Sequence, residues 1–357
     1  MTGPLSTPGL FANNGFELYF SEIGNTVAGR PVELIFEDTK GDPAQGMERI
    51  KRLVEREKVH VLTGITSSAV AYAARDYVDG NKIPLVIMGS SGANGLTGEQ
   101  ASPYIFRTSF SNRQFNAPFG VYMKEKLGYQ KIAIMASDFV TGYEQSDALE
   151  EGFSAAGGEV VQKIFVPLGT ADYAPFISQL KTEEIDAVWA MFFGADSISF
   201  IKQYDEFGLK GKIPLTGSAG LADENNLGGM GDTAEGIILP VYYSPELKTE
   251  ESKKFVESFR AKYGSAPGGT SSSGYIAAQA IAQAIESVNG DVENVEAFTD
   301  ALRQVSFASP QGAFSFDEKQ NVIFDLYAAK IEKVEDGAYR PVIQELMYEN
   351  VDQSWKP

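Results

Sequence analysis

The sequence contains no cysteine and only one histidine, His60, among its 357 residues. Without cysteine the chain has no disulfides, no thiolate nucleophile and no cysteine-based zinc site. A Ser-His-Asp triad would have to use His60, which lies in the apolar run 59–62. We therefore expect His60 to be a partly buried strand residue and not a catalyst.

Long apolar segments and an excess of basic residues are also absent. No stretch of 18 apolar residues occurs, and the first residues lack the charged and apolar regions of a secretion signal; an exported precursor that has lost its signal stays possible. The 48 Asp and Glu residues outnumber the 30 Lys and Arg residues, which gives a net charge of −18. Because the basic residues are not clustered, nucleic acid is not expected as a partner.

The motifs of nucleotide-binding enzymes are missing as well. The glycine-rich segment 89–95 does not have the Gly-x-Gly-x-x-Gly spacing of a dinucleotide site, and no P-loop occurs. Acidic pairs such as Glu183-Glu184 and Glu250-Glu251 fit solvated helix starts better than paired catalytic carboxylates. A nicotinamide-dependent dehydrogenase is thus the enzyme alternative, and it is disfavoured; no cofactor and no metal are expected.

What is present is a regular alternation of strand and helix patterns over the first 240 residues, which indicates βαβ units and a mainly parallel sheet. The expected strands are 32–36, 59–62, 84–88, 131–135, 160–165, 187–193, 213–215 and 236–241. The expected helices include 16–23, one capped by residues 66–68, and 115–127, 143–156, 172–180 and 197–207. The pattern then changes to helices 250–263, 271–288 and 295–304 and strands 312–316 and 322–332. Small apolar residues in helix 271–288 predict close packing on a sheet.

Two similar lobes explain an internal echo. Lys82-Ile83-Pro84-Leu85 before Gly89-Ser90 recurs as Lys212-Ile213-Pro214-Leu215 before Gly217-Ser218, although so few matches can also arise by chance. Helices that follow both lobes imply that the chain crosses between them more than once. The candidate crossovers are 111–115, 242–245 and 316–320.

Several short motifs, in this order and spacing, resemble the type I solute-binding proteins of ABC importers, the Leu/Ile/Val-binding protein family. They are Thr2-Gly3-Pro4-Leu5, Val32-Glu33-Leu34 with Glu37-Asp38 before Asp42-Pro43, the loop 64–68, Phe106-Arg107-Thr108-Ser109, Ala155-Ala156-Gly157-Gly158, Asp172-Tyr173, Asp186-Ala187-Val188, 259–264 and Gly274-Tyr275. The resemblance covers nearly the whole chain.

This resemblance implies an α/β clamshell of two Rossmann-like lobes joined by three crossovers, with a small solute in the cleft. Lobe one would comprise 1–114 and 245–317, and lobe two 115–244 and 318–357. It also implies a membrane permease of an ABC importer as partner, a periplasmic location or an extracytoplasmic lipoprotein, and a monomer. Members begin with a β-strand of about six residues before the Thr-Gly-Pro loop, whereas this chain starts at Met1 in the loop. A missing first strand in lobe one would leave backbone groups unpaired.

Small hydroxyl residues follow two of the expected strands, where ligands bind in open α/β sheets. We expect a ligand carboxylate to meet hydroxyl and backbone N–H groups there, although N-capping is an ordinary alternative for Ser67 and Ser68. The candidate ligand-binding residues are Phe11, Thr66, Ser67, Ser68, Ser90, Ser91, Gly92, Phe139, Thr141, Phe193, Ser218 and Ala219.

The chemistry of the ligand is suggested by a departure from the family. Amino-acid-binding members carry an acid in the loop corresponding to 217–220, but this sequence has Ser218-Ala219, and a buried ammonium without a carboxylate partner is costly. Phe139 and Phe193 favour an apolar body, and since Phe192 and Phe193 alternate, we expect Phe192 in the core. Segments 138–145 and 167–173 resemble the aromatic-acid-binding subgroup. The prediction is an aromatic carboxylate of benzoate or phenylpropanoid type; branched-chain or other amino acids and a sensor domain of a regulator are the alternatives.

Overall fold

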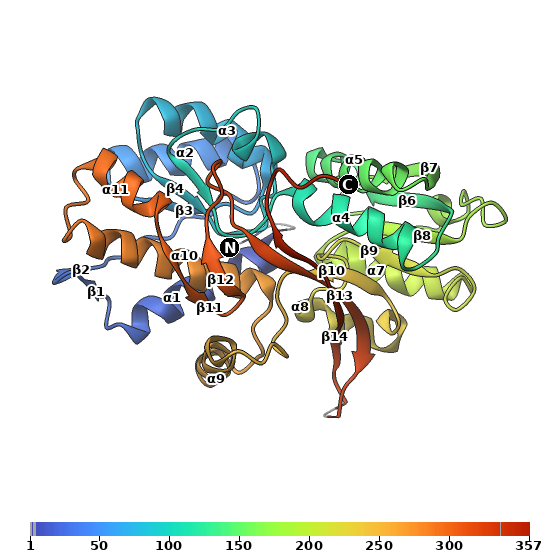
Figure 1. The fold of residues 1–357 in the computed structure, drawn as a ribbon. Coiled ribbons are helices and arrows are strands. Elements are labelled where there is room, and N and C mark those ends of the chain that lie inside the picture. Colours follow the sequence, from blue (N-terminus) through green and yellow to red (C-terminus); the bar gives the residue numbers. More distant parts are fainter. Residues whose placement is uncertain (1, 3–4, 336) are drawn as a thin grey trace. The chain divides into compact units, whose positions relative to one another are not determined.

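The computed structural model describes residue 2, residues 5–335 and residues 337–357 (Figure 1), so Gly3 and Pro4 of the opening motif lie outside it. The chain forms two compact units. Unit 1 comprises 1–111 and 247–324, and unit 2 comprises 112–246 and 325–357. The chain passes from one unit to the other at 111–112, 246–247 and 324–325.

The third crossover differs from the expected segment 316–320. The backbone N–H of Arg107 donates to the carbonyl of Gln320 (2.9 Å), and the N–H of Val322 donates to the carbonyl of Arg107 (2.9 Å). These bonds attach 318–324 to β5 of unit 1 (Ile105–Arg107), so the expected assignment of this stretch to the second lobe is wrong.

Unit 1 contains a short parallel sheet in the order β3-β4-β5, two small antiparallel pairs, β1-β2 and β11-β12, and six α-helices among the described residues. Its helices are α1 Ser6–Glu22, α2 Pro43–Glu55, α3 Ser68–Gly80, η1 Asn94–Thr97, α9 Glu250–Tyr263, α10 Gly269–Ser287 and α11 Val295–Arg303. Its strands are β1 Thr26–Val27, β2 Arg30–Pro31, β3 Leu62–Gly64, β4 Leu85–Ile87, β5 Ile105–Arg107, β11 Ser306–Ser309 and β12 Gly312–Ser315.

Unit 2 is built on a seven-stranded sheet in the order β14-β13-β10-β9-β8-β6-β7. Strands β10 to β7 run parallel, and β13 pairs with β10 antiparallel. The strands are β6 Lys131–Ser137, β7 Glu159–Val166, β8 Ala187–Met191, β9 Leu215–Gly217, β10 Ile238–Val241, β13 Phe324–Lys333 and β14 Tyr339–Val351. The helices are α4 Asn112–Glu125, α5 Val140–Ala155, α6 Ala174–Ile177, α7 Gly194–Glu206, α8 Glu224–Met230 and η2 Gly231–Ala234.

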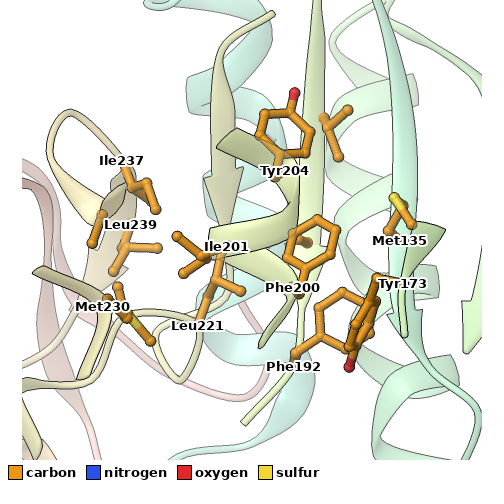
Figure 2. Packing of buried hydrophobic residues seen from close by; sticks show 14 of the residues in the cluster. Met135, Tyr173, Phe192, Phe200, Ile201, Tyr204, Leu221, Met230, Ile237 and Leu239 are labelled. Carbon is orange, nitrogen blue, oxygen red and sulfur yellow. The ribbon is translucent and has the colours of Figure 1, made fainter. Parts of the chain in front are cut away.

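Strand β8 shows why unit 2 is a layered α/β unit. All five of its residues are buried, as expected for a central parallel strand that helices cover on both faces. Directly after it, Phe192 enters the core and packs its ring 4.7 Å from that of Phe200 on α7 and 5.2 Å from that of Tyr173 (Figure 2). The side chain of Phe193 packs against a different hydrophobic cluster from that of Phe192, which confirms the predicted alternation of this pair.

Helix α10 packs mainly on helix α1, a contact that the sequence pattern did not predict. A Cβ atom on Gly274 would lie 2.0 Å from the carbonyl oxygen of Ala12, and one on Gly15 would lie 1.9 Å from that of Ser271. The two helices therefore approach each other through glycine on both sides. None of the helices in the described part of the chain is both long and apolar enough to span a membrane.

Three further expectations in the sequence need correction. Residues 32–36 form no strand, because their backbone has no strand partner among the described residues, and residues 172–180 contain only the one-turn helix α6. The strand expected at 59–62 is β3, which begins only at Leu62. His60, just before it, has a side chain that is 51% exposed and lies 3.5 Å from Glu293, so it is a surface residue.

We predict that Gly274→Ala destabilises unit 1 by about 1–3 kcal/mol, because the new methyl group would force α1 and α10 apart. The control is Gly80→Ala, where a Cβ would meet no atom within 4 Å. Urea unfolding followed by circular dichroism checks both variants. Equal midpoints for the two variants would contradict the importance of this close helix contact.

Candidate functional site

In unit 1, three buried serines follow the carboxyl ends of three adjacent parallel strands. Ser68 comes after β3, Ser91 after β4 and Ser109 after β5, and each is at most 1% exposed. The register pairs Gly64 with Ile87 and Ile87 with Arg107, so the three strand ends lie at one edge of the sheet. The hydroxyl oxygens of the three serines have no hydrogen-bond partner in the described part of the protein.

A buried hydroxyl group without a hydrogen bond costs about 1–3 kcal/mol, so such a group needs an explanation. The lack of a partner does not identify a site by itself, because Ser252 on α9 has the same property. The position at the strand ends distinguishes Ser68, Ser91 and Ser109, since ligands bind there in open α/β sheets. They are therefore candidates for donors to a ligand.

The neighbouring serine, Ser67, has a different role. Its hydroxyl accepts a hydrogen bond from the N–H of Val70 (3.4 Å), and it is the N-cap of α3. The N–H groups of Ser68 and Ala69, in the first turn of α3, make no backbone hydrogen bond among the described residues. Free N–H groups at a helix N-terminus favour an anion. The capping alternative thus holds for Ser67, whereas the Ser68 hydroxyl stays available.

A glycine allows the ends of β3 and β4 to meet closely. A Cβ on Gly89 would lie 2.6 Å from the carbonyl oxygen of Ile65, and the N–H groups of Met88 and Gly89 both donate to the carbonyl of Gly64 at 3.2 Å. These contacts hold Thr66, which is partly buried, beside the start of the loop that contains the remaining candidates of unit 1. In that loop Ser90 is partly buried, and Ser91 and Gly92 are buried.

In unit 2, the predicted residues also follow adjacent strand ends. The register pairs Ala136 with Met191 and Ala190 with Gly217, so β6, β8 and β9 end at one edge of the sheet. Phe139, Phe193 and the pair Ser218-Ala219 come directly after these strands. Thr141, in the first turn of α5, is buried.

Phe139 and Phe193 form an aromatic pair at this edge. Their ring centroids are 5.8 Å apart and the rings meet at 75°, the edge-to-face arrangement that aromatic pairs prefer. A Cβ on Gly220 would lie 3.0 Å from the Phe193 ring, which places the loop after β9 beside the pair. Ser218 in this loop is fully buried, and its hydroxyl has no partner among the described residues. The residues predicted from the sequence in this unit therefore lie together, and their contact with a ligand stays a prediction.

Phe11 lies elsewhere in unit 1. It belongs to α1, and its ring stacks on that of Phe259 of α9 with 6.4 Å between centroids. The structure therefore shows a role in helix packing, and a contact with a ligand stays a prediction.

Ser109 is a candidate that the sequence analysis did not select. Its motif, Phe106-Arg107-Thr108-Ser109, contributed to the family resemblance, but the residue was not chosen as a site residue.

Two acidic residues that the sequence analysis did not single out lie just after the 217–220 loop. Asp223 and Glu224 lie at the start of α8, and burial of the Glu224 carboxyl group, helped by the charge of Asp223, raises its pKa to about 8. Arg340 of β14 opposes this shift. No group of three or more His, Cys, Asp or Glu residues that could hold a metal ion occurs in the described ranges.

Comparison with known proteins decides the family. Residues 1–338 match the family model described as periplasmic binding protein. The Leu/Ile/Val-binding protein homolog 6 of Brucella melitensis is 30% identical over 344 residues, which cover 95% of this chain and 87% of that protein. The chain belongs to the periplasmic binding protein family.

Two solved structures of ABC transporter proteins support this family assignment. The substrate-binding protein from Sphaerobacter thermophilus has a TM-score of 0.93 and 36% identity, covering 99% of this chain and 96% of that one. The solute-binding protein from Rhodopseudomonas palustris BisB5, solved with 3,4-dihydroxybenzoic acid, has a TM-score of 0.92 and 30% identity, with the same coverage. This periplasmic binding protein is thus a substrate-binding protein of an ABC transporter, with the type I fold, and not an enzyme.

We predict that Glu224 makes the stability of this periplasmic binding protein depend on pH. Because its pKa in the folded state is raised above 4.5, the folded protein keeps a proton that the unfolded chain loses as the pH rises from about 5 to 8. The free energy of unfolding should therefore fall through this window, and Glu224→Gln should reduce the fall. Urea titrations at pH 5, 7 and 8.5 measure it. If the free energy of unfolding of Glu224→Gln differs from that of the original protein by the same amount at all three pH values, the raised pKa of Glu224 is contradicted.

Proposed function

We propose that this protein binds a small aromatic carboxylate, of benzoate or phenylpropanoid type, outside the cytoplasm and as a monomer, and delivers it to the membrane permease of an ABC importer. The observation that carries the proposal is the group of buried serine hydroxyls without partners at the strand ends of unit 1. Hydroxyl and N–H donors suit a carboxylate, because hydrogen bonds to an ionised group are about twice as strong as neutral ones.

In this proposal, Ser68 and Ser91, with Thr66, Ser90 and Gly92 beside them, receive the carboxylate. The aromatic pair of unit 2 and the Ser218-Ala219 loop are proposed as the contact surface for the ring. In this proposal, the aromatic ring of the ligand packs against this edge-to-face pair. The dihydroxybenzoic acid in the Rhodopseudomonas palustris structure supports a ligand of this class.

Binding of a branched-chain or other amino acid is the second candidate function. The name of the Brucella relative and the two acids at the start of α8 favour it. The aromatic pair Phe139–Phe193 beside the Ser218-Ala219 loop, which itself carries no acid, favours an aromatic carboxylate instead. The aromatic carboxylate is therefore preferred.

A ligand panel measured by thermal shift and calorimetry tests the ligand class. Benzoate, 4-hydroxybenzoate and 3-phenylpropanoate should raise the melting temperature, and a ligand at 100 times its Kd adds about 2.7 kcal/mol of stability. Benzamide, which lacks the charge, and leucine, which lacks the ring, should have little effect. Stabilisation by leucine with no response to any aromatic acid would favour the amino-acid alternative.

Ser91→Ala should weaken binding of the best aromatic acid about tenfold, because the carboxylate loses one donor. The matched control is Ser252→Ala, which removes an equally buried hydroxyl without a partner from α9. Calorimetry gives Kd for both variants, and their melting curves show whether they fold. An unchanged Kd in a folded Ser91 variant would place the anion site elsewhere.

Phe193→Leu should weaken binding of benzoate about three- to tenfold, since a ring contact beyond the buried area is worth about 0.5–1.5 kcal/mol. The control is Phe207→Leu, at the exposed end of α7. Competition calorimetry with benzoate and cyclohexanecarboxylate separates ring chemistry from size. If both acids lose affinity equally, the aromatic pair acts only as an apolar surface.

A further inference from the structure

The third strand end of unit 1 carries a hydroxyl group that has no role in the carboxylate site proposed above. Ser109 lies two residues after β5 and is 1% exposed, and its hydroxyl oxygen has no hydrogen-bond partner in the described part of the chain. Its N–H group makes no backbone hydrogen bond among the described residues either. Because buried polar groups are nearly always hydrogen-bonded, this hydroxyl calls for a partner from outside the chain.

The direction of the Ser109 side chain follows from the register of the sheet. The N–H of Thr108 donates to the carbonyl of Ile87 (2.9 Å), so the pairing of β4 with β5 continues past Arg107. Successive side chains of a strand point to opposite faces of the sheet. The hydroxyl of Thr108 donates to the carbonyl of Ser273 in α10 (3.0 Å), so the Ser109 side chain points to the face away from this contact.

That face is covered by the loop that follows β4, residues 88–93. Arg107 is two residues before Ser109 and therefore on the same face, and its Nη2 donates to the carbonyl of Ala93 (2.6 Å). The same loop contains residues 90–92 of the proposed carboxylate site. Since neighbouring strands are about 4.8 Å apart, Ser109 lies beside that site, one strand further along the sheet.

The carboxylate site has enough donors without Ser109. It has the hydroxyls of Ser68 and Ser91, and the N–H groups of Ser68, Ala69 and residues 90–92 make no backbone hydrogen bond among the described residues. A carboxylate accepts about four hydrogen bonds, which is fewer than these groups of the β3 and β4 ends can donate. The Ser109 hydroxyl is thus left for a second polar group of the ligand.

The chemistry of a hydroxyl group limits what this second group is. A serine hydroxyl donates one hydrogen bond and accepts up to two, so a neutral keto or hydroxyl oxygen satisfies it. A buried ammonium group requires a carboxylate partner, which Ser109 does not supply. Because Ser109 is next to the carboxylate site, the oxygen belongs on the carbon that carries the carboxylate.

We propose, building on the function proposed above, that Ser109 selects aromatic acids that have a keto or hydroxyl oxygen on the carbon next to the carboxylate. The Ser109 hydroxyl donates to a keto oxygen, or exchanges a hydrogen bond with a hydroxyl group there. Acids without this oxygen bind more weakly, because they leave the buried hydroxyl unpaired. The preferred ligands are therefore 2-oxo and 2-hydroxy acids of phenylpropanoid type.

Calorimetry with the full chain tests this selection through three acids of one carbon skeleton: phenylpyruvate, 3-phenyllactate and 3-phenylpropanoate. The original protein should bind phenylpyruvate and one enantiomer of phenyllactate about tenfold more tightly than phenylpropanoate. In Ser109→Ala, Kd for phenylpyruvate should rise about tenfold, and Kd for phenylpropanoate should change less than about twofold. Ser252→Ala, which removes a similarly buried hydroxyl from α9, is the control and should change neither value.

The other outcomes contradict the role of Ser109 in distinct ways. Equal weakening of phenylpyruvate and phenylpropanoate in the folded variant would show that Ser109 binds the carboxylate itself. Unchanged Kd values would show that water satisfies its hydroxyl. Equal Kd values for the two acids in the original protein, which need no variant, would overturn the selection while the aromatic carboxylate stands. Tighter binding of L-phenylalanine than of phenylpyruvate would place an ammonium group there. If benzoate and all three acids fail to bind the original protein, the proposed function fails as well.

Discussion

The parallel pairing of strands is the constraint on which the candidate site depends. In each unit it brings the carboxyl ends of neighbouring strands to one edge, and the residues that follow those ends meet there although they are far apart in sequence. In unit 1 the pairing gathers hydroxyl groups, whereas in unit 2 it gathers aromatic rings. The same rule thus gives two surfaces of different chemistry in the two units. The two copies of the internal echo occupy corresponding places, because they lead into the parallel strands β4 and β9.

For a strongly acidic protein, the proposed binding of an anion needs local sources of positive potential. The net charge of −18 acts over the whole surface and is screened by salt, while N–H and hydroxyl dipoles act within hydrogen-bond distance. The N-terminus of α3 supplies such dipoles next to Ser68. Anion binding at this edge therefore does not require an excess of basic residues.

The sequence predicts the strand ends well and the pairing of edge segments poorly. Polar and small residues after apolar runs located Ser68, Ser91 and Ser218, because the ends of central strands have a clear composition. Residues 32–36 have an equally clear strand pattern but form no strand, since a strand needs a partner and periodicity does not report one. The long strand β14 was missed for the opposite reason: it is an edge strand with many exposed residues, so its pattern is weak. The third crossover was misplaced because the hydrogen bonds between Arg107 and 320–322 join residues more than 200 positions apart.

The candidate anion site of unit 1 depends on one short strand, β3. β3 has only three residues, and its carboxyl end carries Ile65, a β-branched residue with a φ of 59°, which is the left-handed region. Such a residue is strained and keeps its conformation only when its surroundings fix it. On one side β4 supplies that support through Gly64 and Gly89. On its other side β3 has no neighbouring strand among the described residues, so β4 is the strand that fixes the segment that positions Ser68. The contact between the ends of β3 and β4 and the position of the Ser68 hydroxyl are therefore physically coupled through residues 64–68.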